Sequence, residues 1–417
     1  MLVPCEDDSE LYSRFYLTPD RIQLMFGSLE MAPPDAILGL NVAFRNDTNP
    51  SKINLGVGVY KDETGNTPVL ACVKKAEQLL LEQENSKSYL GIDGLPEYGP
   101  LVRKVLFDGT VEEARAVTLQ TPGGTGALRV AGDFLKHKVG ASRIWLSNPT
   151  WANHNGVFSS AGLAVDAYTY LDNTGLALDF QGMLDSIAQI PAGDVICLHA
   201  CCHNPSGVDP SAEQWEQIAE ACKAGGVLPL IDFAYQGFAN GLQEDAAAIR
   251  LFADKVDEFL VCSSFSKNFG LYCERIGALT IVAQDESAAT AALSHAMKAV
   301  RTNYSNPPKH GGAVVTTVLG CDELFTQWDT EVAAMRDRIN GLRKLFVDTM
   351  AAKNSPVDFS FIQQQRGMFS YSGLNAMQVD QLKNDHSIYI VGSGRINVAG
   401  LNSGNVEQLC DAILQVL

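Results

Sequence analysis

Short apolar segments alternate with amphipathic ones through the middle of the chain, from about Ala116 onward. The apolar segments have the length of buried strands; they are residues 117–120, 144–147, 195–199, 227–233, 259–263 and 278–282. Helical periodicity follows Gly126, and a second helix is expected to begin at Asp209-Pro210 with proline in its first turn. This alternation predicts an α/β fold in which helices cover both faces of a mostly parallel sheet.

The C-terminal part of the chain has a different pattern. One long helix is predicted by the apolar positions Trp328, Val332, Met335, Ile339, Leu342 and Phe346. Strand-like segments follow at residues 359–362, 367–370 and 388–391. This pattern predicts a second, smaller α+β domain. In the first kind of sheet, ligands bind beyond the carboxyl ends of the strands, so the loops there should carry the chemistry.

Charge and cysteine content exclude several classes of function. The net charge of -17 argues against nucleic acid or an anionic membrane as a partner. The ten cysteines form no C-x-x-C pair, so we expect neither a zinc site nor a disulfide framework, and no metal. No apolar run is long enough for a membrane span, and the acidic N-terminus does not resemble a signal peptide. We therefore expect a cytoplasmic protein.

A glycine-rich turn, Gly123-Gly124-Thr125-Gly126, lies between a predicted strand and a predicted helix. Its glycines would let the backbone approach a ligand, and the free N–H groups of the helix start could bind phosphate. A tight turn without a ligand explains this motif alone equally well.

Lys267 follows the strand at 259–263, in the segment S-S-F-S-K-N-F-G. A lysine among polar and aromatic residues at a strand end can form a Schiff base if its pKa is depressed, although most lysines are solvated surface residues. Arg275 could join the hydroxyls of Ser264 and Ser266 in a phosphate clamp.

Four further candidate residues lie at or after the ends of predicted strands. Asp232 could cap a turn or pair with a cationic ring nitrogen, and Tyr235 and Asn204 could bind a phenolic oxygen. Trp151 could be a core aromatic or stack on a flat cofactor. Together with the glycine-rich turn and Lys267, they form the set of groups that pyridoxal phosphate requires.

Eight segments of the chain resemble the class I aspartate aminotransferases of the fold-type I superfamily, most closely the bacterial ones. The matching segments are residues 53–65 (I-N-L-G-V-G-V-Y-K-D-E-T-G), 89–95 (Y-L-G-I-D-G-L), 121–129 (T-P-G-G-T-G-A-L-R), 201–207 (C-C-H-N-P-S-G), 232–238 (D-F-A-Y-Q-G-F), 264–272 (S-F-S-K-N-F-G-L-Y), 303–308 (N-Y-S-N-P-P) and 393–400 (S-G-R-I-N-V-A-G). The resemblance extends from Met25 to Leu417.

The resemblance implies a role for each matching residue. Lys267 would bind pyridoxal phosphate covalently, Asp232 would pair with its ring nitrogen, and His154 would support Asp232. Tyr235 and Asn204 would bind the phenolic oxygen, and Trp151 would stack on the ring. The phosphate would be bound by Gly123, Gly124, Thr125, Ser264, Ser266, Arg275 and, from the neighbouring subunit, Tyr89.

The resemblance also implies how substrates bind. Arg395 would bind the α-carboxylate, with Asn204 and Gly58 assisting, and Phe369 would lie nearby. Arg301 would bind the distal carboxylate from across a dimer interface. The homodimer would then be needed for activity, and amino acids and 2-oxo acids would be the substrates.

The family architecture implies a seven-stranded, mostly parallel sheet in a large cofactor domain at residues 68–334. The small domain would combine residues 35–67 and 335–417, residues 25–34 would form an N-terminal arm, and residues 1–24 have no counterpart. Ser88 departs from the asparagine that is common in bacterial relatives, which weakens the substrate assignment.

Aspartate aminotransfer is the activity that the resemblance implies, with two alternatives. One is an aromatic-amino-acid aminotransferase, or dual specificity, although Val59, Lys61 and Asn306 are typical of aspartate enzymes. The other is a non-catalytic regulator that reuses the fold, which would require a fused DNA-binding domain.

Overall fold

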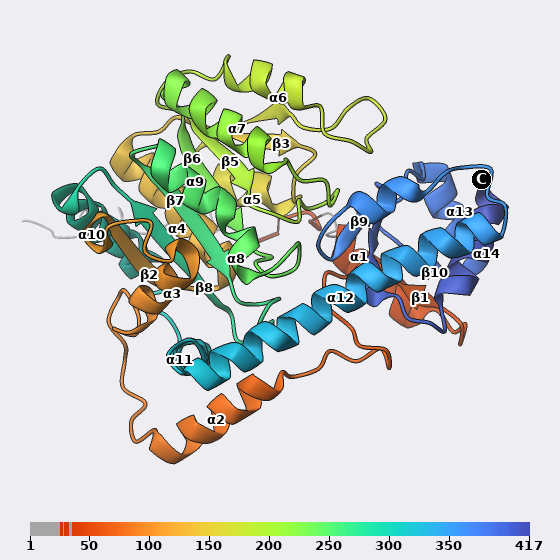
Figure 1. Cartoon of the computed structure of the whole chain (residues 1–417), viewed down its shortest axis with the longest axis horizontal. Coiled ribbons are helices and arrows are strands. Elements are labelled where there is room, and N and C mark those ends of the chain that lie inside the picture. Colours follow the sequence, from red (N-terminus) through yellow and green to blue (C-terminus); the bar gives the residue numbers. More distant parts are fainter. Residues whose placement is uncertain (1–25, 28, 33–35) are drawn as a thin grey trace, which may run out of the picture.

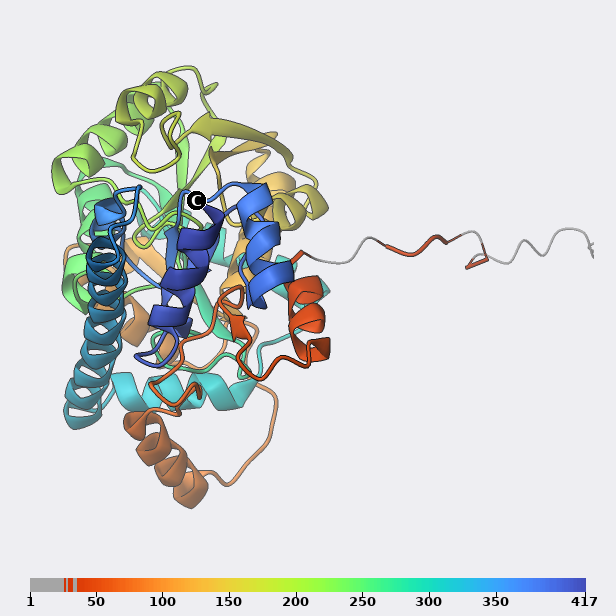
Figure 2. The ribbon, with the colours of Figure 1, turned by 90° about the vertical axis from the view of Figure 1, so that its right-hand side faces the viewer.

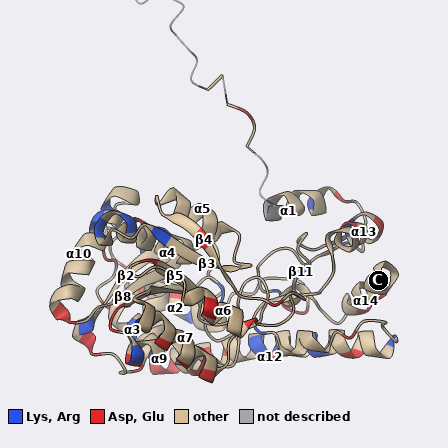
Figure 3. Ribbon diagram, turned by 90° about the horizontal axis from the view of Figure 1, so that it is seen from above, with Lys and Arg blue, Asp and Glu red and all other residues tan. Residues whose placement is uncertain are grey.

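The structure is a computed structural model that describes residues 26, 27, 29–32 and 36–417. The predicted extension at residues 1–24 lies outside the described residues, as do residues 25, 28, 33 and 34 of the predicted arm. No helix in the described part of the chain is both long and apolar enough to cross a membrane. Acidic and basic positions are both spread over the outer helices (Figure 3), so the negative charge is not confined to one element.

A seven-stranded sheet forms the centre of the larger part of the molecule (Figure 1). In space its strands follow the order β2 (Ala116–Pro122), β8 (Ile276–Val282), β7 (Phe259–Ser264), β6 (Leu228–Phe233), β5 (Val195–His199), β3 (Arg143–Asn148) and β4 (Ala164–Thr169). The pairs from β7 to β4 are parallel, and only β8 runs antiparallel to its neighbours. The prediction of a mostly parallel, seven-stranded sheet is confirmed.

Helices cover both faces of this sheet because the buried strands are apolar on both faces. In β5, Val195 and Cys197 join one core cluster, whereas Ile196 and Leu198 join the other. One face is covered by α4 (Gly123–Phe134), α5 (Asn153–Ser160) and α10 (Glu286–Asn303); the other is covered by α3 (Tyr98–Phe107), α6 (Phe180–Ile187), α7 (Ala212–Gly225) and α9 (Ala247–Lys255). The short α8 (Leu242–Asp245) precedes α9, and α2 (Ala71–Gln83) packs on α11 (Lys309–Leu319).

The smaller part combines both ends of the described chain. Figure 2 shows the first helix beside the C-terminal helices. Strand β1 (Ile53–Asn54) pairs in parallel with β10 (Ile388–Tyr389), and β9 (Phe369–Tyr371) pairs antiparallel with β11 (Arg395–Asn397). Around them lie α1 (Ala36–Asn46), α13 (Ala376–His386) and α14 (Val406–Val416). The long helix α12 (Asp322–Ala352) extends from α11 into this smaller part (Figure 1).

Two details of the sequence prediction are wrong. Residues 359–362 are not a strand, because Ser360–Gln364 forms a 3-10 helix. The helix expected at Asp209-Pro210 begins at Ala212, after Ser211, which accepts a hydrogen bond from the backbone of Gln214 in a capping box. Pro210 therefore precedes the helix and does not form its first turn.

Candidate active site

Several loops that the sequence singled out meet at one edge of the sheet. Strands β2, β3, β5, β6 and β7 run in the same direction, since β2 and β7 are both antiparallel to β8. Their carboxyl ends carry the glycine-rich turn, the Trp151 loop, the Asn204 loop, the Asp232 segment and the Lys267 loop. The amino end of β8, next to Arg275, lies at the same edge.

A cavity of about 240 Å³ opens at this edge. Its lining residues are Gly58, Gly124, Thr125, Leu128, Trp151, Asn204, Asp232, Ala234, Tyr235, Ser264, Ser266, Lys267, Tyr272, Arg275, Phe369 and Arg395. Among the predicted site residues, Gly123, Tyr89, Arg301 and the supporting residue His154 do not line it. Residues that are far apart in the sequence, from Gly58 to Arg395, therefore converge on one cavity.

One end of the cavity has the features of a phosphate site. Helix α4 begins at Gly123 without a side-chain cap, so its first N–H groups remain available to an anion. Arg275 donates from Nη1 to Ser266 Oγ at 3.3 Å. Gly123 has a φ of 77°, and a Cβ there would lie 2.8 Å from Arg275 Cζ, so only glycine fits beside the guanidinium.

Lys267 lines this cavity and is partly buried, and its Nζ lies 4.8 Å from the centre of the Tyr235 ring. Burial lowers the pKa of Lys267, because desolvation disfavours the ammonium. The negative charge of Asp232 acts in the opposite direction, and the positive charge of Arg275 lowers the pKa further. The lowered pKa increases the share of neutral amine, which is the form that attacks a carbonyl carbon.

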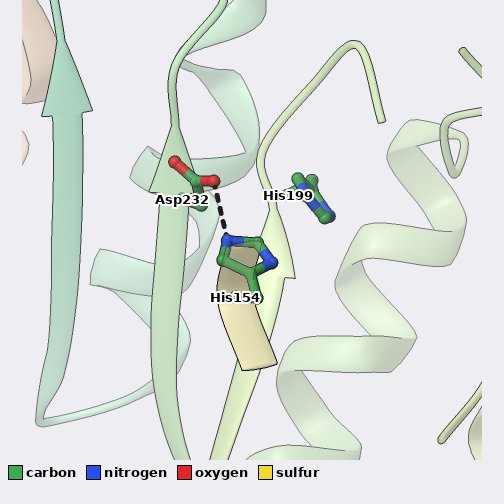
Figure 4. Close-up of side chains that lie close together, drawn as sticks. All are labelled: His154, His199 and Asp232. Atoms are coloured by element: carbon green, nitrogen blue, oxygen red, sulfur yellow. Dashed lines mark hydrogen bonds and ion pairs between the residues drawn. The ribbon is translucent and has the colours of Figure 1, made fainter. Parts of the chain in front are cut away.

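Asp232 lies beside two buried imidazoles, those of His154 and His199 (Figure 4). Burial alone would raise the pKa of Asp232, but the hydrogen bond from His154 and the positive charge of nearby groups such as Lys267 hold it below its usual value. His154 Nε2 lies 3.1 Å from Asp232 Oδ2, and His154 Nδ1 lies 2.8 Å from Thr150 Oγ1. Asp232 therefore presents a fixed, ionised carboxylate to the cavity.

His154, His199 and Asp232 also form the one cluster in the described part of the chain whose ligand atoms could surround a metal ion; they lie within 4.8 Å of one another. The hydrogen bond between His154 Nε2 and Asp232 Oδ2 occupies the nitrogen and the oxygen that a metal would need. Burial lowers the pKa of His199 to about 3, so this imidazole is neutral. The cluster is better suited to holding Asp232 in place.

Arg395 provides a further cation in the lining of the cavity. Its Nη2 donates to Gly56 O at 2.7 Å and its Nη1 to Asn204 Oδ1 at 3.4 Å, while the guanidinium lies 4.1 Å from the centre of the Phe369 ring. The buried Nε has no hydrogen-bond partner among the described residues. A buried donor without a partner is costly, so this side of the cavity is suited to an anionic ligand such as a carboxylate.

Tyr89 and Arg301 lie outside this cavity. Tyr89 is 93% exposed, and both residues line a separate surface hollow of about 860 Å³ together with Asn306. A single chain therefore does not bring these two predicted residues to the site.

Three lining residues were missed from the sequence: Leu128, Ala234 and Tyr272. Tyr272 lies between Lys267 and Arg275 in the sequence, and this position was an available signal. Its hydroxyl accepts a hydrogen bond from the backbone N–H of Tyr60 at 2.9 Å. Leu128 and Ala234 are apolar residues beside predicted site residues, and their sequence pattern is that of ordinary core positions.

Comparisons with known proteins agree with this geometry. Residues 50–413 match the family model described as aminotransferase class I and II. The chain belongs to this family. Its sequence is 53% identical to that of the aspartate aminotransferase of Escherichia coli (strain K12), and the match covers 94% of this chain and 100% of that protein. It is 47% identical to the aromatic-amino-acid aminotransferase of Pseudomonas aeruginosa, over 94% of this chain and 98% of that one.

The solved structures give the same fold. The aminotransferase resembles the aromatic-amino-acid aminotransferase from Burkholderia pseudomallei, a structure with covalently bound pyridoxal phosphate, with a TM-score of 0.92 at 46% identity. The match covers 94% of this chain and 99% of that one.

Proposed function

We propose that this aminotransferase is a pyridoxal-phosphate-dependent aspartate aminotransferase, which transfers the amino group of L-aspartate to 2-oxoglutarate and yields oxaloacetate and L-glutamate. The observation that carries the proposal is the convergence of Lys267, Asp232 and Arg395 on one cavity. The higher identity to the Escherichia coli aspartate enzyme than to the Pseudomonas aromatic enzyme supports the choice of substrate.

The residues of the cavity fit the cofactor that the Burkholderia structure contains. The start of α4, Ser264, Ser266 and Arg275 would bind the phosphate, and Trp151 would stack on the ring. When bound, pyridoxal phosphate supplies an aldehyde for amine exchange and a ring that accepts electron density. Asp232 would keep a proton on the ring nitrogen, because an ionised, fixed carboxylate favours the protonated form.

Lys267 has two tasks in this proposal. Its side chain would hold the cofactor, and its unprotonated amine would take the proton from the substrate α-carbon as general base and donate it again as general acid. Its lowered pKa makes the unprotonated amine available for both tasks. Tyr235 and Asn204 would hold the phenolic oxygen of the cofactor, so that the ring keeps its orientation during proton transfer.

The two carboxylates of the substrate need two cations. Arg395 would bind the α-carboxylate with its unpaired Nε and the adjacent Nη atoms. Arg301 would bind the distal carboxylate in the partner's site, and Tyr89 would reach the partner's phosphate; the exposure of both on one chain supports a homodimer with shared sites. The cytoplasmic location and the domain limits at residues 67/68 and 334/335 stay predictions.

We expect borohydride reduction of the purified enzyme to fix the cofactor on Lys267. The reduced adduct is stable, so peptide mapping by mass spectrometry should find the pyridoxyl group on the peptide that contains residues 264–270. The variant Lys267→Ala is the control and should carry no adduct. An adduct on another lysine would contradict the proposal.

We expect mixed dimers of Lys267→Ala and Arg301→Ala chains to regain activity on aspartate. In such a dimer one site combines the intact Lys267 of one chain with the intact Arg301 of the other. Activity should be measured on heterodimers isolated with two different affinity tags. Inactive heterodimers, alongside inactive parent homodimers, would show that Arg301 does not act across the interface.

Dual specificity is the second candidate. It is favoured by the close structural match to the Burkholderia aromatic-amino-acid aminotransferase. The ratio of kcat/KM for aspartate to that for phenylalanine separates the two candidates.

A further inference from the structure

Arg343, in the half of α12 that enters the smaller part of the molecule, is 1% exposed and has no role in the chemistry proposed above. Its Nε donates to Ser370 Oγ at 3.2 Å and its Nη1 to Asn340 Oδ1 at 3.3 Å. Its Nη2 donates to the backbone carbonyl of Phe369 at 3.0 Å and also to that of Gly367. All of the donor-bearing nitrogens are thus committed to neutral oxygens.

No carboxylate among the described residues lies at hydrogen-bond distance from this guanidinium, and burying an unpaired charge at a packing position is costly. Burial lowers the pKa of Arg343 to about 10; Cys202 and Asp209 raise it and Arg366 lowers it, so the group is still charged at neutral pH. A leucine would fill much of the same space without this cost. The hydrogen bonds therefore indicate that the segment Gly367–Ser370 needs to be held in one place.

That segment contains Phe369, whose ring lies next to Arg395 in the proposed carboxylate site. In the pairing of β9 with β11, Phe369 lies opposite Asn397 and Tyr371 lies opposite Arg395. The Phe369 ring faces the Arg395 guanidinium at 4.1 Å, and a Cβ on Gly58 would lie 2.9 Å from its Cζ. A shift of the segment would therefore move both the ring under Arg395 and the strand that carries Arg395.

The opposite side of the segment packs against the loop that carries Asn204. Arg366 N donates to Gly207 O at 2.7 Å, and a Cβ on Gly207 would lie 2.6 Å from Phe369 O. The carbonyl of Phe369 thus lies between the Gly207 backbone and the Arg343 guanidinium. Arg343 is the one charged side chain among the described residues that donates hydrogen bonds to this carbonyl.

We infer that Arg343 is a positioning residue for substrate binding: it fixes Gly367–Ser370 so that Phe369 and Arg395 meet the α-carboxylate in the correct geometry. This inference rests on the proposed role of Arg395. Arginine suits the task because its planar fork reaches two carbonyls and a hydroxyl at once, whereas a lysine ammonium is a single point of donation.

The test compares Arg343→Met and Arg343→Lys with Arg336→Met. Arg336 is a matched control because it lies on the same helix and also donates to a backbone carbonyl, Gly237 O at 3.0 Å, outside the cavity lining. The measurements are KM and kcat for aspartate and for phenylalanine, and the dissociation constant of succinate from the absorbance of the bound cofactor. Melting temperature and cofactor content serve as checks on folding.

Arg343→Met should raise KM for both amino acids and the dissociation constant of succinate by about tenfold, less than the roughly hundredfold that a misplacement of about 1 Å can cost. The value of kcat should fall less than KM rises, because Lys267 and Asp232 are not moved. Arg343→Lys should recover part of the loss, and Arg336→Met should leave KM and the succinate constant unchanged. If Arg343→Met does not fold, Arg343→Lys and Ser370→Ala should each show a smaller rise in the same constants.

Two results would overturn the inference: unchanged KM and succinate binding in the Arg343 variants, or an equal rise in Arg336→Met. Arg395→Leu, measured in parallel, separates this failure from failure of the proposed function. If Arg395→Leu weakens binding and the Arg343 variants do not, only the role of Arg343 is wrong. If Arg395→Leu leaves binding of both amino acids unchanged, the assignment of the carboxylate site is wrong.

Discussion

Arg301→Leu should lower kcat/KM for aspartate and glutamate by roughly 30-fold to several thousandfold, because breaking a buried charge pair costs about 2–5 kcal/mol. Each carboxylate of the substrate loses water when it enters the site, and only a charged donor replaces that water well. Arg301 is exposed on one chain, which is compatible with the proposed role of binding the distal carboxylate in a partner's site. Phenylalanine and tyrosine have no second carboxylate, so their kcat/KM should change little or rise.

Arg395→Leu is the matched comparison, since every amino acid has an α-carboxylate. It should lower kcat/KM for aspartate and for phenylalanine alike, and the ratio of the two constants separates the roles of the two arginines. If Arg301→Leu instead lowers both substrate classes equally, the distal-carboxylate role is wrong and the aspartate assignment loses its main support.

Asp232→Ala should retain the cofactor but lose most of its activity, with kcat lower by about 10²–10³ or more, the range found when one preorganised electrostatic group is removed. Without the carboxylate, the ring nitrogen loses its proton more readily and the ring accepts electron density poorly. Cofactor content follows from the absorbance spectrum, and kcat follows from a coupled assay of oxaloacetate. Near-normal turnover would contradict the role of Asp232.

The lowered pKa of Asp232 leads to a prediction for a second variant, Asp232→Asn. A carboxyl whose pKa is lower in the folded state stabilises the fold above its unfolded pKa, about 3.9, and loses that contribution as the pH falls through the folded value. At pH 7 the natural protein should therefore have the larger free energy of unfolding. Its difference from Asp232→Asn should shrink as the pH is lowered, as thermal or denaturant unfolding would show. Asp232→Asn should keep the shape of the site and still lose activity.

Sequence patterns predicted the buried strands well and the exposed ones poorly. β5 was predicted with its observed bounds because all of its residues are buried, and a strand covered on both faces is a continuous apolar run. β4 was missed because it is an edge strand with only one fully buried residue and has no such run. The segment F-S-F-I at 359–362 alternates like a strand, but only a 3-10 helix forms there.

The candidate site was predictable where a motif follows a strand end, as at Lys267, Asp232 and the glycine-rich turn. It was less predictable where tertiary contacts decide. Tyr89 and Arg301 do not reach the cavity of their own chain, and no periodicity in one sequence could place them. Arg343 is also recognisable in the sequence. It lies four residues after Ile339 and three before Phe346, on the apolar face of the predicted helix, and a cation at such a position indicates a buried charge.

Helix α12 contacts both the loop that follows Lys267 and the segment that lies beside Arg395. Near its start, Trp328 donates from Nε1 to Asn268 O at 2.8 Å and stacks on Phe269, the two residues that follow Lys267. Arg343, on the same helix, holds the segment below Arg395. Fifteen residues of α-helix span about 22 Å, and each residue adds about 1.5 Å and turns the helix by about 100°. The helix therefore sets the distance between the proposed reactive amine and the proposed carboxylate site. Natural insertions or deletions between Trp328 and Arg343 would change both the length of this helical segment and the direction in which Arg343 points.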